Sequence, residues 1–168
     1  MLHWALGNNQ DAVVRIMLEH HFNPNLIDPV YGPPLFYANP DCAQLLLAHG
    51  ADVNAHNKQG ITLLMSESDL GTAQLLIDHG ADVNAQDNAG QTALMWHVDR
   101  SNKTVSLLRL LLHHGARISL KDHEGHTALD YAKERGTDPD TGEVSNMEVI
   151  RLLKAAIQTN KEANPATR

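Results

Sequence analysis

The sequence predicts an all-α repeat protein, a solenoid of stacked pairs of short helices, and two observations carry that prediction. First, one stretch returns along the chain: LLLAHGADVNA at 45–55, LLIDHGADVNA at 75–85, LLLHHGARISL at 110–120 and a divergent copy, IMLEHHFNPNL, at 16–26. Second, the copies begin 29, 30 and 35 residues apart. A period of roughly 20–50 residues marks a repeat architecture, in which each unit needs its neighbours to bury its apolar face.

The clearest unit, residues 87–115, divides into a turn, a helix, a loop and a second helix. Residues 87–90 have the composition of a turn, because Gly supplies backbone freedom and Asx side chains supply local hydrogen bonds. A first helix is expected at 92–96, and the polar run 99–103 interrupts it. The second helix has leucines on more than one side, so neighbours must cover it on both sides. Gly115 is expected to end it in a left-handed conformation.

The N-terminal units depart from this pattern. The chain begins inside a first helix, and its second helix ends at His21 instead of Gly, so His21 is expected in a left-handed conformation at some cost. In the second and third units only 15 and 16 residues separate the leading Leu from the helix-ending Gly, against 21 in the fourth. Their first helices are therefore expected to be clipped to little more than one turn. Asn39 and Pro40 have the form of a capped helix start.

The C-terminal unit is expected to close the stack. Residues 137–144 are an insertion after Gly136, and Ser145 to Glu148 has the form of a capping box that opens a last helix. That helix has Val149, Ile150 and further leucines on one side and charged residues on the other, so it can cover the end of the repeats.

The residues of these units resemble the ankyrin repeat. The matches are Gly90-Gln91-Thr92-Ala93-Leu94, the run GHTALDYA at 125–132, and the two GADVNA runs at 50–55 and 80–85. The resemblance extends from Leu2 to about Ala156. It implies an ankyrin-repeat solenoid of helix-turn-helix pairs linked by β-hairpin-like turns. It also implies one domain at 1–157, with units at 1–26, 27–55, 56–85, 86–120 and 121–157, and a flexible tail at 158–168.

Composition and charge exclude several classes of partner. The 168 residues include 13 Lys and Arg against 20 Asp and Glu, a formal charge of −7 with no basic cluster. Because phosphate affinity comes mainly from counterions displaced by Lys and Arg, no nucleic-acid partner is expected. No apolar run approaches the ~20 residues that span a bilayer, and no signal peptide is visible. Cys42 is the only cysteine, so no disulfide framework is expected and a reducing, cytoplasmic location is the default. The chain alone is expected to be a monomer.

The motifs that suggest chemistry each fail on spacing. The run His123-Glu124-Gly125-His126 places its histidines three apart, whereas the zinc-protease motif needs four on one helical face. The run 138–142 begins like a calcium loop but has Gly fifth instead of sixth. His49, His79 and His114 share one repeat position before the helix-ending Gly, where His favours the helix dipole. No catalytic residue, metal or cofactor is expected, and the chain is not expected to be an enzyme.

Aromatic residues recur at one repeat position and are the first candidate binding residues. Four of the seven Phe, Trp and Tyr residues are the second residue after the Leu of the first helix: Trp4, Tyr37, Trp96 and Tyr131, with Ser66 in the third unit. The resemblance implies that this position faces the concave groove. Aromatic side chains are favoured interface anchors, although partial packing against the next helix explains them equally well.

The tips of the turns are the second candidate binding element, because the resemblance implies that residues beside the turn Gly contact partners. In this chain the tips differ from unit to unit, and Tyr31 is expected to replace the turn Gly of the first tip. The tip candidates are Tyr31; Lys58, Gln59 and Ile61; Asn88 and Gln91; and His123, Glu124 and His126.

These observations predict a non-catalytic protein–protein interaction module that binds a partner protein through its concave groove and turn tips. Two alternatives stay open: an inhibitor or self-protection protein that blocks one enzyme, and a secreted effector or scaffold that engages host proteins. The irregular repeats resemble those of bacterial ankyrin proteins. The sequence does not name the partner.

Overall fold

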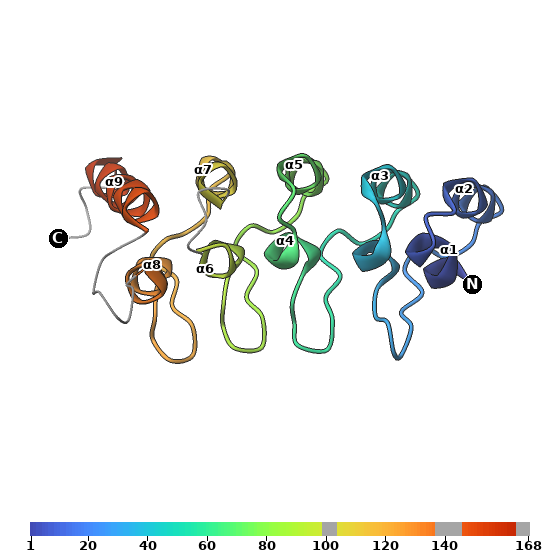
Figure 1. Cartoon of the computed structure of the whole chain (residues 1–168), viewed down its shortest axis with the longest axis horizontal. Helices are drawn as coiled ribbons and strands as arrows, with labels where there is room; N and C mark the ends of the chain where they lie inside the picture. The colour runs from blue at the N-terminus through green and yellow to red at the C-terminus, as the bar shows by residue number, and fades with distance from the viewer. Residues whose placement is uncertain (99–103, 137–145, 164–168) are drawn as a thin grey trace. The chain divides into compact units, whose positions relative to one another are not determined.

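The computed structural model describes residues 1–98, 104–136 and 146–163 (Figure 1). Over these ranges it contains helices and isolated two-residue β-bridges, and no strand. The helices are α1 (Leu2–Gly7), α2 (Asp11–Glu19), η1 (Pro34–Tyr37), α3 (Pro40–Ala48), α4 (Leu63–Ser66), α5 (Leu70–Asp78), α6 (Ala93–Trp96), α7 (Thr104–His113), α8 (Ala128–Gly136) and α9 (Met147–Ala163). The predicted all-α repeat fold is confirmed.

The chain divides into two compact units, Met1–Asp82 and Val83–Arg168, which are described separately. In the N-terminal unit α1 packs on α2 and η1, α2 packs on α3, and α3 packs on α5. Leucines fill the spaces between these helices and are almost fully buried, among them Leu6, Leu18, Leu46 and Leu76. Burying one such side chain contributes roughly 1.5–3 kcal/mol, so the stack depends on them.

In the C-terminal unit α6 packs on both α7 and α8, and α9 packs on α8 and α7. Met95, Leu108, Leu111 and Leu153 form the buried centre of this unit, each with an exposed fraction of 2% or less. The last helix therefore covers the final repeat, as the sequence predicts.

The first helices are clipped, which confirms the prediction for the second and third units. The 3₁₀ helix η1 and the α-helix α4 have four residues each. Helix α6 also has four, and the polar run 99–103 that follows it lies outside the described residues. The predicted cap at Asn39 is confirmed, because its side chain accepts a 2.8 Å hydrogen bond from the Cys42 N–H.

An asparagine in the loop after α2, in the loop after α3 and in the loop after α5 bonds the equivalent loop of the following repeat. The Asn54 amide oxygen accepts from the Asp82 N–H at 2.8 Å, and its amide nitrogen donates to the Gly80 carbonyl at 3.3 Å. Asn25 bonds Asp52 and Gly50 in the same way, and Asn84 bonds Arg117 and Gly115. The side-chain hydrogen bonds of the recurring Asn therefore link neighbouring repeats within each unit.

The ends of the helices follow the expected chemistry, with one difference in length. His21 has a φ of 61°, which confirms the left-handed conformation expected where Gly is missing. Helix α9 extends to Ala163, six residues beyond the predicted domain end at 157, so this part of the expected tail is helical. Residue Ser145 of the expected capping box lies outside the described residues. In the described ranges no helix is long and apolar enough to span a membrane.

Candidate functional site

Each turn tip is built around one Asx side chain at its base. The Oδ1 atom of Asp87 accepts hydrogen bonds from the backbone N–H groups of Ala89 and Gln91, both at 2.9 Å. Asn57 holds Gln59 and Ile61 in the same pattern, and Asp122 holds Glu124 and His126. Two backbone donors bound by one side chain fold the loop locally, which is the turn chemistry that Asx residues supply.

The first tip differs from the others by one residue. Asp28 accepts from the N–H groups of Val30 and Tyr31, and the left-handed residue is Gly32, with a φ of 81°. The expectation that Tyr31 replaces the turn Gly is therefore wrong. The physical reason is that the tip makes its reversal one residue later, where Gly tolerates a positive φ without steric cost and Tyr does not.

The two candidate aromatics of the C-terminal unit bind the carboxylates that form the tips. The indole N–H of Trp96 donates to Asp87 Oδ2 at 2.9 Å, and the Tyr131 hydroxyl donates to Asp122 Oδ2 at 2.7 Å. Gln91 in turn donates to the Tyr131 oxygen at 2.6 Å. Both rings are half-buried. The structure therefore gives Trp96 and Tyr131 a bracing role that the sequence pattern did not reveal.

The bond between Tyr131 and Asp122 shifts the pKa values of both partners. Burial of Asp122 opposes its charge, but hydrogen bonds from the Tyr131 hydroxyl and from the His126 and Glu124 N–H groups hold its pKa below the ordinary value. The bond to Asp122 also raises the pKa of Tyr131. Each group is therefore held in the protonation state that keeps the bond.

The two tips of the C-terminal unit contact each other directly. The His123 N–H donates to the Ala89 carbonyl at 2.9 Å, and Gln86 donates to the Lys121 carbonyl at 3.1 Å. Gly90 lies so close to the second tip that an added Cβ would stand 2.8 Å from His123 Cδ2 and 2.9 Å from its backbone nitrogen. The tips at 87–91 and 122–126 therefore form one joined surface that carries Asn88, Gln91, His123 and Glu124.

His126 lies at the acidic side of that surface. Its Nδ1 is 3.6 Å from a Glu124 oxygen and 3.8 Å from an Asp122 oxygen, and its Nε2 is 3.9 Å from a Glu134 oxygen. Its ring also meets the Tyr131 ring edge-on, with centroids 5.7 Å apart.

Of the other tip candidates, Lys58 and Gln59 are exposed and Ile61 is half-buried.

An aromatic cluster of His3, Tyr31 and Tyr37 forms in the N-terminal unit. The three ring centroids lie 5.8–6.3 Å apart, and His3 Nε2 is 2.8 Å from the Gly32 carbonyl oxygen. Tyr31 is 56% exposed and Tyr37 39%. Two candidates from different sequence patterns are thus brought together by His3, which the sequence analysis did not select and which only its contacts reveal.

Further apolar side chains lie exposed beside this cluster in sequence. Trp4 follows His3 on α1 and is 64% exposed, and Val30 precedes Tyr31 and is 81% exposed. We call His3, Trp4, Val30, Tyr31 and Tyr37 the N-terminal aromatic surface. The rings of His3, Tyr31 and Tyr37 lie together, and grouped exposed apolar side chains mark interaction sites more often than scattered ones do.

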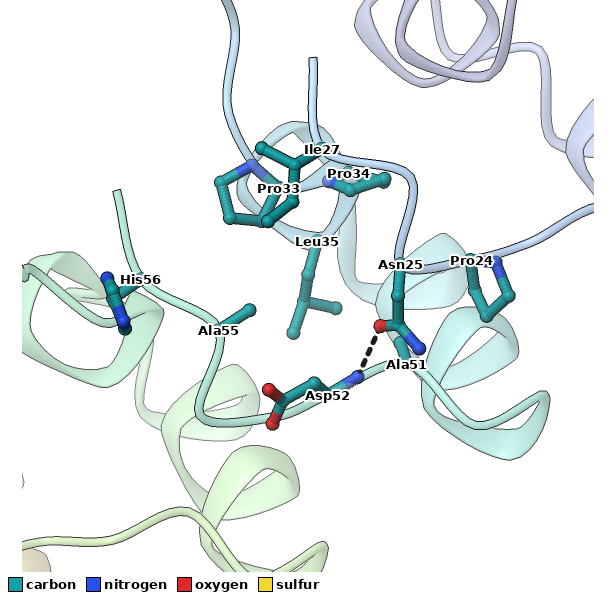
Figure 2. Close-up of a pocket in the computed structure, with 10 residues that line it drawn as sticks. All are labelled: Pro24, Asn25, Ile27, Pro33, Pro34, Leu35, Ala51, Asp52, Ala55 and His56. Atoms are coloured by element: carbon teal, nitrogen blue, oxygen red, sulfur yellow. Dashed lines mark hydrogen bonds between the residues drawn. The ribbon is translucent and has the colours of Figure 1, made fainter. Parts of the chain in front are cut away.

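A small cavity of about 150 Å³ lies at the junction of the first two repeats of this unit (Figure 2). Ile27, Pro33 and Pro34 line one side, and Leu35 points into its centre from below them. Asp52, held by its backbone bond to Asn25, and Ala55 close the other side (Figure 2). Ile27 is 63% exposed, so an apolar cleft opens near the first tip.

The part of the chain that the structure describes gives little support for a metal site or a reactive thiol. No three His, Cys, Asp or Glu side chains gather there as metal ligands. Cys42 is buried, and burial together with its bond to Asp11 raises its pKa to about 12, so it remains a thiol. The run 138–142, which begins like a calcium loop, lies outside the described residues.

Two family models match the chain. One, described as ankyrin repeats in three copies, covers residues 62–163, and the other, described as a single ankyrin repeat, covers residues 34–58. No curated protein sequence matches the chain. The resemblance seen in the repeat residues is therefore confirmed over more than half of the chain.

Proposed function

The chain belongs to the ankyrin-repeat family, whose repeats generally mediate protein–protein interactions and are typically non-catalytic, and from this premise we propose that it holds a partner protein on its aromatic residues and turn tips. The observation that carries the proposal is the N-terminal aromatic surface. Single exposed apolar side chains are common on folded proteins, but exposed apolar side chains that lie together mark interaction sites.

The chemistry of that surface suits a protein partner. Tyr and Trp bury large area with few rotatable bonds, and for this reason they are enriched among the residues that dominate binding energy. Trp4, Tyr31 and Tyr37 are three such side chains, and the stacked His3 ring reduces the motion that Tyr31 and Tyr37 would lose on binding. The cavity beside Ile27 offers a place for one apolar side chain of the partner.

In the C-terminal unit the proposed contacts are polar. The joined tips present Asn88, Gln91, His123, Glu124 and His126, and the half-buried rings of Trp96 and Tyr131 lie behind them. Lys58, Gln59 and Ile61 lie on the tip at 57–61. Because the braces and the contact between the tips order these loops before binding, association loses less conformational entropy than it would with loose loops.

The experiment compares the wild-type chain with a Trp4→Ala/Tyr31→Ala/Tyr37→Ala variant in quantitative co-purification from cells that express the chain. A matched control, Val13→Ala/Ile16→Ala, removes exposed apolar side chains from α2 instead. We expect the triple variant to capture at least tenfold less partner than the wild-type chain, and the control to capture as much as wild type. Equal capture by all three chains, with unchanged helical circular dichroism, would refute the role of the aromatic surface.

The same measurement separates the forms of the proposal. A single stoichiometric enzyme partner, whose activity falls when the chain is added, favours an inhibitor. Several substoichiometric partners favour a scaffold or an effector. A chain that turns over a substrate by itself would contradict a purely binding role.

A further inference from the structure

A second hollow surface lies in the C-terminal unit, away from the tips. It is a groove of about 1140 Å³ between the last turn of α7, the loop 115–119 that follows it, and the C-terminal half of α9. Its floor includes Leu112, Ile118, Leu152, Ala156 and Ile157. Leu112, Leu152, Ala156 and Ile157 are only half-buried, so part of the apolar floor faces solvent.

The groove exists because the two outer helices of this unit diverge. Figure 1 shows α7 nearly end-on and α9 inclined to it. Beside the last turn of α7 and the loop 115–119, Leu152, Ala155, Ala156 and Thr159 of α9 line the groove. Val149 and Leu153 are buried, whereas Leu152, Ala156 and Ile157 are half-buried and line the groove.

Among the side chains that the structure describes, the polar groups of the groove are neutral or basic. Arg109, His113 and Arg117 line it and no described carboxylate does, in a chain with 20 Asp and Glu against 13 Lys and Arg. Both guanidinium groups are on exposed residues, and neither forms an ion pair with any residue that the structure describes. The C-terminal end of α7 adds a partial negative charge of only about half a unit, which the two arginines exceed.

We propose that this groove binds an amphipathic helix of a partner protein, with an apolar stripe that faces the floor and carboxylates that pair with Arg109 and Arg117. Helices of this kind lie in hydrophobic grooves by residues spaced i, i+3, i+4 and i+7. A helix about 10 Å wide with a rise of 1.5 Å per residue fills the observed volume with roughly ten residues.

Charge selects this occupant over the chain's own C-terminus. Residues 164–168 are Asn, Pro, Ala, Thr and Arg, so that even with a terminal carboxylate beside Arg168 this segment has no net negative charge to meet the arginines. Arg also suits the role, because its planar guanidinium bonds both oxygens of a carboxylate and is desolvated more easily than Lys. The groove and the N-terminal aromatic surface share no residue, so this proposal does not depend on the preceding one.

The test selects binders from a displayed library of helical peptides of about 14 residues, with Leu at the i, i+3, i+4 and i+7 positions and all other positions random. The bait is the full chain. We expect enriched peptides to carry Glu or Asp beside the Leu stripe. Their affinity should fall at least tenfold for Arg109→Glu/Arg117→Glu and also fall as ionic strength rises.

Matched variants locate the binding. Arg151→Glu reverses a charge on an exposed residue of α9 that does not line the groove, and should leave affinity unchanged. Ala156→Arg should block the groove, and Trp4→Ala/Tyr31→Ala/Tyr37→Ala should bind like wild type. The proposal is overturned by a library without binders, by enriched peptides that are neutral or basic, or by equal affinity for the double reversal. A wild-type dimer that the double reversal dissociates would overturn it in favour of a second copy.

Discussion

The indole N–H of Trp96 donates a 2.9 Å hydrogen bond to Asp87 Oδ2, nine residues earlier in the chain, and Asp87 uses its other oxygen to fold the turn tip at 87–91. Tyr131 and Asp122 repeat this relationship in the fifth unit, again nine residues apart. In these two units the aromatic side chain of the first helix therefore fixes the turn tip that precedes it in the chain. The bond links the aromatic residue and the tip, which are both proposed to contact a partner.

Loss of the indole N–H should weaken the fourth unit. Trp96→Phe keeps a ring but leaves one oxygen of the buried Asp87 carboxylate without this donor, and we expect a loss of about 1–2 kcal/mol in the free energy of unfolding, measured in urea. Tyr37→Phe is the control, because the described structure gives its hydroxyl no hydrogen bond. A change of similar size in both variants would argue against the brace.

Stability should fall in acid, and part of that fall should depend on Tyr131. Hydrogen bonds from Thr127 lower the pKa of Asp130, and hydrogen bonds from Thr72 lower the pKa of Asp69. The pKa of Asp122 is also lowered, although its burial acts in the opposite direction. A carboxyl whose pKa is lower folded than unfolded stabilises the fold above its unfolded pKa of about 4. That contribution is lost as pH falls through the folded-state pKa.

Tyr131→Phe removes the donor to Asp122, so its unfolding free energy should depend less steeply on pH below about 4 than that of wild type. Denaturant titrations between about pH 3 and pH 7 measure this. Identical slopes for the two chains in that window would contradict the assignment.

Gly90 should tolerate a side chain less well than Gly125 does. Both have positive φ, of 81° and 88°, so Ala imposes backbone strain of about 1 kcal/mol at either position. Only at Gly90 would the new Cβ also strike the neighbouring tip, at His123. Gly90→Ala should therefore lower the unfolding temperature more than Gly125→Ala, and equal effects would mean that the tips are not in contact.

Asn54→Ala should weaken the packing of the third repeat on the second. The substitution removes two hydrogen bonds to the loop 80–82, each worth about 0.5–1.5 kcal/mol net. Gln44→Ala, an exposed position on α3, is the matched control and should cost less than about 0.5 kcal/mol. Hydrogen exchange of the Asp82 amide, whose acceptor is lost, should accelerate in the Asn54 variant alone.

Cys42 should be chemically silent in the folded chain. Because the thiolate is the reactive form and the pKa of Cys42 is raised to about 12, disulfide reagents at pH 8 should modify it only as fast as the chain opens. The unfolded chain in denaturant should react within the time of mixing. Rapid modification of the native chain would show that Cys42 is exposed.

Sequence by itself determined the repeat register and the local ends of the helices. The spacing predicts left-handed residues after the second helices, and φ is 84° at Gly50, 88° at Gly80 and 86° at Gly115. His21, which takes the place of Gly in the first repeat, has a φ of 61°. Asn39 caps α3, also as predicted. These features depend on groups within a few residues of each other, and such groups are visible in the chain as a pattern.

Tertiary structure alone decided what the candidate residues touch. The cluster of His3, Tyr31 and Tyr37 joins residues about thirty positions apart, and Gln91 reaches Tyr131 across 40. The inclination of α9, which opens the groove beside Arg109, depends on how one helix packs on another (Figure 1). A repeat pattern records which positions are equivalent, but distances between side chains of different repeats arise only when the repeats stack and their surfaces meet.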